Sequence, residues 1–129
     1  MAHETFFPTL DEVLYLHAAL LARHGGAPGV RDLGLVESAL ARPRSGYYAS
    51  LSEQASALLQ SFARNHAFVD GNKRVAWAIA CVFLRVNGYV VVVDADDAER
   101  FLIERVIGSH AEIDEIRGWL EARMAPASG

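Results

Sequence analysis

The feature that most constrains the fold is a run of ten residues, from Val75 to Leu84, in which every side chain is apolar. A helix over this run is hydrophobic on all faces, and such a helix belongs at the centre of a bundle. A membrane span needs about 20 apolar residues. We therefore expect a buried central helix and no membrane-spanning segment.

Capping signals and apolar periodicity predict further helices on both sides of this run. The expected N-terminal caps are Thr9, with Glu12 in a capping box, and then Asp32, Ser52, Asp94 and Ser109. The first of these helices should end at Gly25-Gly26, and Pro43 should stop the second. Residues 89–93 have high β-propensity but no obvious partner strand, and residues 125–129 are expected to fray. We predict an all-α bundle of about six helices, with at most one short strand or flap, in a single domain covering residues 1–129.

Composition and charge narrow the classes of function. The chain is 52% hydrophobic and 22% charged, which is typical of a globular protein. Its formal net charge of −4 argues against general nucleic-acid binding. Residues 60–90 nevertheless carry a net charge of +3, an arrangement that steers a small anionic ligand. There is no signal-peptide pattern, and the lone Cys81 cannot form an internal disulfide, so we expect a soluble cytoplasmic protein.

The residues that carry chemistry come directly before the apolar run, at the N-terminus of the central helix. The first backbone N–H groups of a helix lack internal partners and carry the positive end of its dipole. Gly71 allows a sharp turn, and Asn72, Lys73 and Arg74 then offer amides and cations to one space. Lys73 is the only lysine in the chain. This arrangement predicts a phosphate-binding site.

Two side chains that precede Gly71 in the chain complete a candidate catalytic site. Asp70 is an oxygen ligand that can hold Mg²⁺ beside a polyphosphate, and His66 can act as a general base. Each residue also has a purely structural interpretation, as a helix cap or as part of a solvated first turn. Cations at a helix N-terminus oppose the dipole, however, so an anion is expected to offset Lys73 and Arg74.

The sequence His66-x-Phe68-x-Asp70-Gly71-Asn72-x-Arg74 resembles the core motif of the Fic/Doc superfamily, H-x-F-x-[DE]-[GA]-N-x-R. Two further stretches, residues 7–13 with His17 and residues 29–40, resemble the death-on-curing (Doc) toxin branch of this superfamily. The lysine at position 73 resembles the Doc toxin branch. The tryptophan at position 77 also resembles that branch, because Fic adenylyltransferases usually carry a second Arg at this position. Gly71 is more Fic-like, since Doc proteins often have Ala at that position.

The resemblance implies a toxin that transfers the γ-phosphoryl group of ATP to a threonine of a translation factor such as elongation factor Tu. His66 would be the general base and Asp70 the Mg²⁺ ligand. Gly71, Lys73 and Arg74 would hold phosphates, and Asn72 would fix the loop or contact a phosphate. Self-inhibiting Fic proteins carry the sequence [ST]-x-x-x-E-[GN], which has no match here, so an antitoxin in trans is expected.

Three alternatives remain open. The first is adenylylation by the same residues with the nucleotide reversed. The second is a metal-dependent hydrolase, for which His66 and Asp70 supply only two ligands. The third is a catalytically inactive module that binds an antitoxin.

Three further positions have two interpretations each. The loop from Pro43 to Ser50, with Arg44, Gly46 and Tyr47, corresponds to a flap that would hold the target by β-type pairing, or it is an ordinary connection. His17 lies on the apolar face of the first helix. A histidine in such a position is more often a core residue with its hydrogen bonds satisfied than a residue that binds a ligand. Arg64 is adjacent to the motif and is a weaker candidate for a nucleotide contact.

Overall fold

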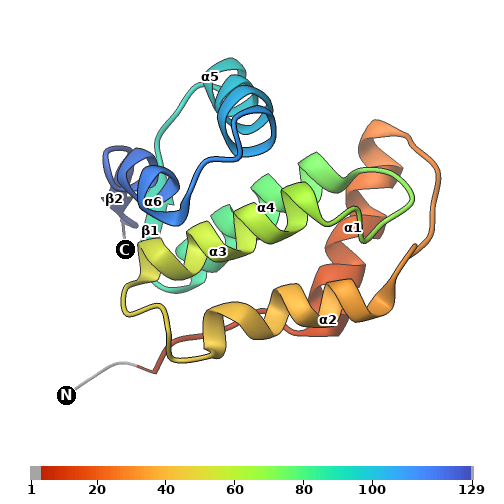
Figure 1. The fold of residues 1–129 in the computed structure, drawn as a ribbon, viewed down its shortest axis with the longest axis horizontal. Coiled ribbons are helices and arrows are strands. Elements are labelled where there is room, and N and C mark those ends of the chain that lie inside the picture. Colours follow the sequence, from red (N-terminus) through yellow and green to blue (C-terminus); the bar gives the residue numbers. More distant parts are fainter. Residues whose placement is uncertain (1–3, 129) are drawn as a thin grey trace.

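The computed structural model describes residues 4–128 and confirms an all-α architecture. Its elements are α1 (Leu10–His24), α2 (Leu33–Ala41), the 3₁₀ turn η1 (Arg42–Arg44), α3 (Leu51–Arg64), α4 (Asn72–Val86), β1 (Tyr89–Val91), α5 (Ala95–Arg100), the π-helical segment η2 (Phe101–Gly108), α6 (Ile113–Glu121) and β2 (Met124–Pro126). In Figure 1, α3 and α4 run side by side through the middle, with α1 and α2 on one side and α5 and α6 on the other. None of the helices within residues 4–128 is long and apolar enough to cross a membrane.

The core lies between α3 and α4, whose facing side chains are fully buried. Leu58, Leu59 and Phe62 of α3 pack in one cluster with Ile79 and Phe83 of α4. Fully burying side chains of this size contributes roughly 1.5–3 kcal/mol each. The two helices that flank the candidate site are therefore firmly held in the bundle.

Local capping chemistry sets the starts of the first three helices. Thr9 forms the expected capping box with Glu12, and the hydroxyl of Thr9 accepts the amide of Glu12 at 3.2 Å. Asp32 caps α2 as predicted. The cap of α3 is Ser50 and not Ser52, because the hydroxyl of Ser52 instead donates to Glu121 of α6.

The C-terminal third differs from the sequence-based expectation. The strand β1 has a partner after all, since β2 pairs with it in antiparallel register, with Val90 opposite Ala125. Residues 124–126 are thus part of a two-stranded sheet and not of a frayed tail. The expected Ser109 capping box is absent, because α6 begins at Ile113 and the Ser109 hydroxyl donates to the carbonyl of Glu104. Asp94 precedes α5 without a side-chain cap.

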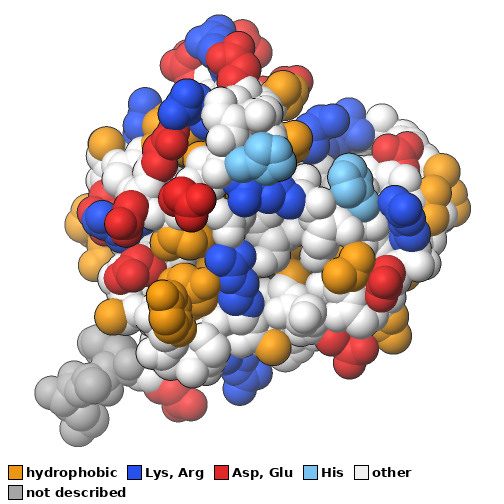
Figure 2. All heavy atoms as spheres, in the orientation of Figure 1, with side chains coloured by type: hydrophobic (Ala, Val, Ile, Leu, Met, Phe, Trp, Pro, Cys, Tyr) orange, Lys and Arg blue, Asp and Glu red, His pale blue; other side chains and the backbone are white. Residues whose placement is uncertain are grey.

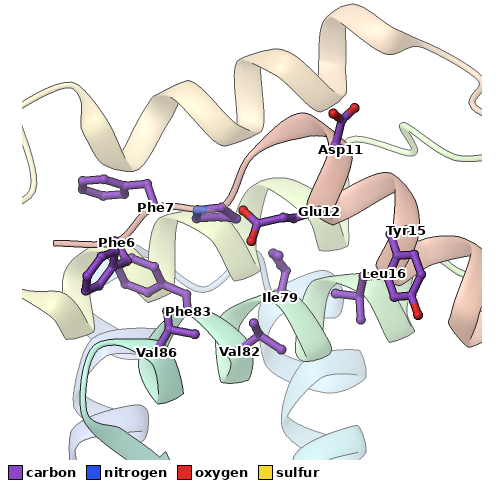
Figure 3. A pocket seen from close by; sticks show the side chains of 11 residues that line it. Phe6, Phe7, Asp11, Glu12, Tyr15, Leu16, Ile79, Val82, Phe83 and Val86 are labelled. Atoms are coloured by element: carbon purple, nitrogen blue, oxygen red, sulfur yellow. The ribbon is translucent and has the colours of Figure 1, made fainter.

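The central helix α4 is not buried on all sides. Val75, Ile79 and Phe83 face the core, but Val82 and Val86 are 45% and 53% exposed. They line an apolar groove of about 590 Å³ between α4 and the segment that leads into α1. Figure 3 shows the aromatic and aliphatic side chains of both elements facing each other across it. One face of the central helix is therefore accessible.

Candidate active site

The position of His66 is set by the end of α3. Asn65 is the C-cap of that helix, and His66 follows with a left-handed φ of 52°. Left-handed residues commonly end helices, although a side chain there costs roughly 1–2 kcal/mol. Asn65 fixes the turn, since its side chain accepts the amide of Ala67 at 3.1 Å and donates to the carbonyl of Leu35 at 3.2 Å. His66 is exposed, and its ring forms no hydrogen bond within residues 4–128. The ring nitrogens are thus available to contact a ligand.

Asn72 holds the loop between α3 and α4 in shape. Its Oδ1 accepts the amide of Phe68 at 3.0 Å, and its Nδ2 donates to the carbonyl of the same residue at 2.9 Å. The ring of Phe68 is buried and stacks on His17 with centroids 3.9 Å apart. The Asn72 side chain therefore fixes the loop, which was the first of its two expected roles.

His17 is a satisfied core histidine, as its structural interpretation predicted. The side chain is 5% exposed, and Nε2 lies 2.9 Å from the backbone carbonyl oxygen of Asp70. A carbonyl only accepts, so Nε2 carries the proton in this contact. His17 supports the loop from the core side and does not reach the site itself.

Asp70 is held ionised by backbone amides. Its Oδ2 accepts the amide of Ala27 at 3.1 Å, and its Oδ1 accepts the amide of Gly71 at 2.9 Å. The bond from Ala27, then the bond from Gly71, and more weakly the charge of Arg74 lower the pKa of this carboxyl. The carboxylate is exposed, so each oxygen can still contact a ligand on its free side.

The contact between Asp70 and Ala27 requires a glycine at position 26. A Cβ on Gly26 would lie 2.9 Å from Oδ2 of Asp70 and 2.8 Å from the side chain of Leu21, and φ there is +124°. In the sequence, Gly25-Gly26 indicated only the end of the first helix. The adjacent glycine pair was the one available signal that the backbone passes close to another group.

The segment that lines the motif is the loop before α2. An antiparallel bridge joins Val30 to Phe68, and backbone hydrogen bonds of 3.1 and 2.8 Å flank it on both sides. Figure 1 shows this orange loop beside the green loop between α3 and α4. The N–H and C=O groups of Val30 form no hydrogen bond within residues 4–128, and the side chain is 38% exposed. One edge of this short strand is therefore free.

The predicted flap lies elsewhere. Arg44, Gly46 and Tyr47 precede α3, whereas His66 follows it, and a helix of 14 residues separates the two ends by about 21 Å. Figure 1 shows the yellow loop and the green loop at opposite ends of α3. Tyr47 is 83% exposed, and the guanidinium of Arg44 lies over the ring of Phe7. The structure does not bring these residues to the motif.

The N-terminus of α4 offers unpaired donors. Gly71 is its N-cap, with φ of 80° and no side-chain cap. The amides of Asn72, Lys73 and Arg74 have no hydrogen-bond partner within the described part of the chain, and the first turn contains no acid. Lys73 and Arg74 are exposed and form no ion pair there. Three amides and two cations thus remain available to an anion.

Two neighbouring residues serve the fold. Arg64 donates from Nε to the carbonyl of Val106 at 2.8 Å and from Nη2 to the carbonyl of Ala111 at 2.9 Å, so it anchors the turn after η2. Trp77 packs edge-to-face on Trp119 of α6, with centroids 6.0 Å apart. The structure thus gives Arg64 a role in the fold, whereas the sequence suggested only a nucleotide contact.

Basic side chains lie in the middle of the face shown in Figure 2. In Figure 2, Lys and Arg side chains together with histidines lie along the middle of the face, while Asp and Glu side chains are interspersed with Lys and Arg side chains around them. This distribution agrees with the positive charge of residues 60–90 in a chain of net charge −4.

Comparison with known proteins identifies relatives of this chain. Residues 7–84 match the profile of the Fic/DOC family. The chain is 44% identical to Toxin Doc of Mycolicibacterium smegmatis over 92% of its own length and 95% of that protein. It is 40% identical to Protein kinase doc of Escherichia phage P1 over 63% of its own length and 68% of that protein.

Proposed function

This chain belongs to the Fic/DOC family, and from that premise we propose that it is a toxin that transfers the γ-phosphoryl group of ATP to a hydroxyl group of a protein. The observation that carries the proposal is the N-terminus of α4, where unpaired amides and two cations directly follow the Asp70 carboxylate, whose pKa the charge of Arg74 helps to lower. The names of the two relatives, a toxin and a protein kinase, agree with it.

The proposed transfer uses each motif residue for one task. His66 accepts the proton of the attacking hydroxyl, whose oxygen forms a bond to the γ-phosphorus. The bond from that phosphorus to the bridging oxygen breaks, and ADP leaves with the electron pair. Lys73, Arg74 and the first amides of α4 hold the phosphates and stabilise the negative charge of the transition state. Asn72 keeps the loop in the shape that this alignment needs.

Asp70 fits the role of a magnesium ligand. Mg²⁺ is commonly held by one or two carboxylates together with substrate phosphates and water. The carboxylate is ionised and exposed, and within residues 4–128 no three His, Cys, Asp or Glu residues come together as a metal cluster. A single carboxylate suits an ion that arrives with the nucleotide better than it suits a hydrolytic metal centre. Such an ion would neutralise phosphate charge.

We propose that the target segment binds along the free edge at Val30. An extended peptide can add to an exposed strand edge through backbone hydrogen bonds. The opposite edge of Val30 is already bridged to Phe68, so a bound segment would run beside the motif loop. This assignment replaces the loop around Arg44, Gly46 and Tyr47.

The kinase assignment rests on positions 73 and 77. Lys73 adds a positive charge beside Arg74, and Trp77 is engaged with Trp119, so this turn of α4 offers no second arginine. Adenylylation remains the second candidate because Gly71 is the Fic-like residue at its position. A threonine of elongation factor Tu is the target that the resemblance implies, with the cytoplasm as the place of action and an antitoxin as the neutralising partner.

The decisive experiment labels the nucleotide at two positions. The protein is incubated with bacterial lysate, Mg²⁺ and ATP labelled on either the γ- or the α-phosphate, with a folded His66→Ala variant as control. We expect label on a protein target from the γ position only, and none with His66→Ala. Label from the α position would instead establish adenylylation. Absence of transfer from both, with equal growth of cells expressing either protein, would establish the inactive module.

A further inference from the structure

A second basic site lies outside the motif, in a polar cleft between α2 and α3. The cleft has a volume of about 440 Å³ and is lined by Leu35, Ser38, Ala39, Arg42, Gln60, Ser61, Arg64 and Asn65. Its lining includes Asn65, the C-cap of α3, but none of the motif residues. A volume of this size is typical of a small-molecule site.

Two guanidinium groups meet at this cleft. Arg42 donates from Nη1 to the hydroxyl of Ser61 at 3.0 Å and from Nε to the hydroxyl of Tyr48 at 2.8 Å. Ser61 is three residues before Arg64 on α3, so both side chains lie on the same face of that helix. Arg64 is fixed from its other side by the carbonyls of Val106 and Ala111. Each guanidinium is therefore held in place and keeps one terminal nitrogen without a partner in the described residues.

The charges in the cleft are not balanced by its own lining. No carboxylate is among the lining residues, and neither arginine forms an ion pair within residues 4–128. Burial, and to a smaller extent the charge of Arg42, lower the pKa of Arg64, while Glu112 acts in the opposite direction from the start of α6. Two like charges held close together favour an anion between them.

We propose that this cleft binds a phosphate group carried by a small organic molecule. A phosphate dianion matches two guanidinium groups in charge, and arginine forks bind its oxygens with two parallel hydrogen bonds. The side chains of Ser38 and Asn65 supply neutral donors at the edge, and Leu35 and Ala39 supply an apolar wall for the organic part. The site is separate from the nucleotide site and does not depend on phosphoryl transfer.

Calorimetric titration with glycerol 3-phosphate at constant ionic strength tests the proposal. The motif site is first removed by Lys73→Ala with Arg74→Ala, and we expect binding to remain in that protein. Adding Arg42→Gln should weaken it at least about 10-fold, the effect of roughly one charge-assisted hydrogen bond. Arg44→Gln is the matched control, since it removes the same charge two residues away and outside the cleft. It should leave the dissociation constant unchanged.

Two outcomes overturn the proposal: loss of binding in the Lys73→Ala, Arg74→Ala protein, or equal weakening by Arg42→Gln and Arg44→Gln. If Arg42→Gln fails to fold, Ser38→Glu keeps both arginines and places a carboxylate at the cleft edge, so it should abolish binding. Inorganic phosphate is titrated in parallel. Weaker binding of inorganic phosphate identifies an ester as the ligand, and equal binding identifies free phosphate.

Discussion

At the scale of single residues, Asn72 links the fold of the motif to its chemistry. Its side chain closes two hydrogen bonds with the backbone of Phe68, and the loop that carries His66 and Asp70 depends on that clamp. A phosphate contact and a loop clamp were both compatible with an asparagine at this position. They differ in their effect on stability, because only the clamp exists without a ligand.

We predict that Asn72→Ala lowers the free energy of unfolding by about 1–3 kcal/mol, because two hydrogen bonds of about 0.5–1.5 kcal/mol each are lost. Chemical denaturation of the ligand-free protein measures the change. Arg74→Ala is the control, since its side chain forms no hydrogen bond within residues 4–128 and should leave stability nearly unchanged. Wild-type stability with weakened ATP binding in Asn72→Ala would assign the side chain to the phosphate instead.

A second residue-scale prediction concerns pH. The amides of Ala27 and Gly71 lower the pKa of Asp70 below its unfolded value near 3.9, so the ionised form stabilises the folded state. That contribution is complete above the unfolded pKa and is lost as pH falls through the folded pKa. We expect wild type to melt at a higher temperature than Asp70→Asn at pH 7, and the difference to shrink below about pH 4. A difference that is constant from pH 7 to pH 2 would contradict it.

The sequence was most informative at this scale. The motif indicated His66, Asp70 and the residues that begin α4 as candidate site residues because they are neighbours in the chain. It could not indicate that Ala27 donates to Asp70, since 43 residues separate them and only the folded loop brings them together. The free backbone edge at Val30 was missed for the same reason.

At the scale of elements, the ends of helices account for both successes and errors. Thr9 and Asp32 were correctly predicted as caps because their partners lie three residues away. The π-helical segment η2 and the pairing of β1 with β2 were not predicted, because their stability depends on contacts with distant residues. Arg64 is one such residue, since it binds carbonyls that are 42 and 47 positions further along the chain.

We predict that Arg64→Met destabilises the protein by about 1–3 kcal/mol, because methionine retains much of the apolar stem but leaves two carbonyls without a charged donor. Thermal unfolding measures the loss, and Arg85→Met, at an exposed position of α4, serves as the control. Hydrogen exchange should accelerate at residues 106–111. Unchanged stability with weaker nucleotide binding would return Arg64 to the active site.

At the scale of the whole molecule, the central helix α4 is incompletely covered. Val82 and Val86 of α4 face the groove with Phe6 and Tyr15, and all four side chains are more than 40% exposed. The apolar run from Val75 to Leu84 predicted a helix buried on every side. Within residues 4–128, that expectation is wrong at the groove. An exposed apolar surface of this kind marks an interaction site.

We propose that the covering element is a segment of the antitoxin that folds on the toxin. Asp11 and Glu12 border the groove, so a helix with an apolar face and basic flanks would match it in shape and charge. Such a segment can remain disordered until it binds, because it lacks a core of its own.

Val82→Glu tests this assignment without altering the motif. Val82 is 45% exposed, so the variant should fold and stop growth as the wild type does when it is expressed alone. A carboxylate in the groove must be desolvated against apolar side chains when the antitoxin binds, and it adds to the repulsion from Asp11 and Glu12. Co-expression of the antitoxin should therefore rescue cells that carry the wild-type toxin but not those that carry Val82→Glu.

Val92→Glu introduces the same charge at a 67% exposed position outside the groove, and cells that carry it should be rescued like wild type. Equal rescue of both variants, with co-purification at wild-type affinity, would place the antitoxin on another face.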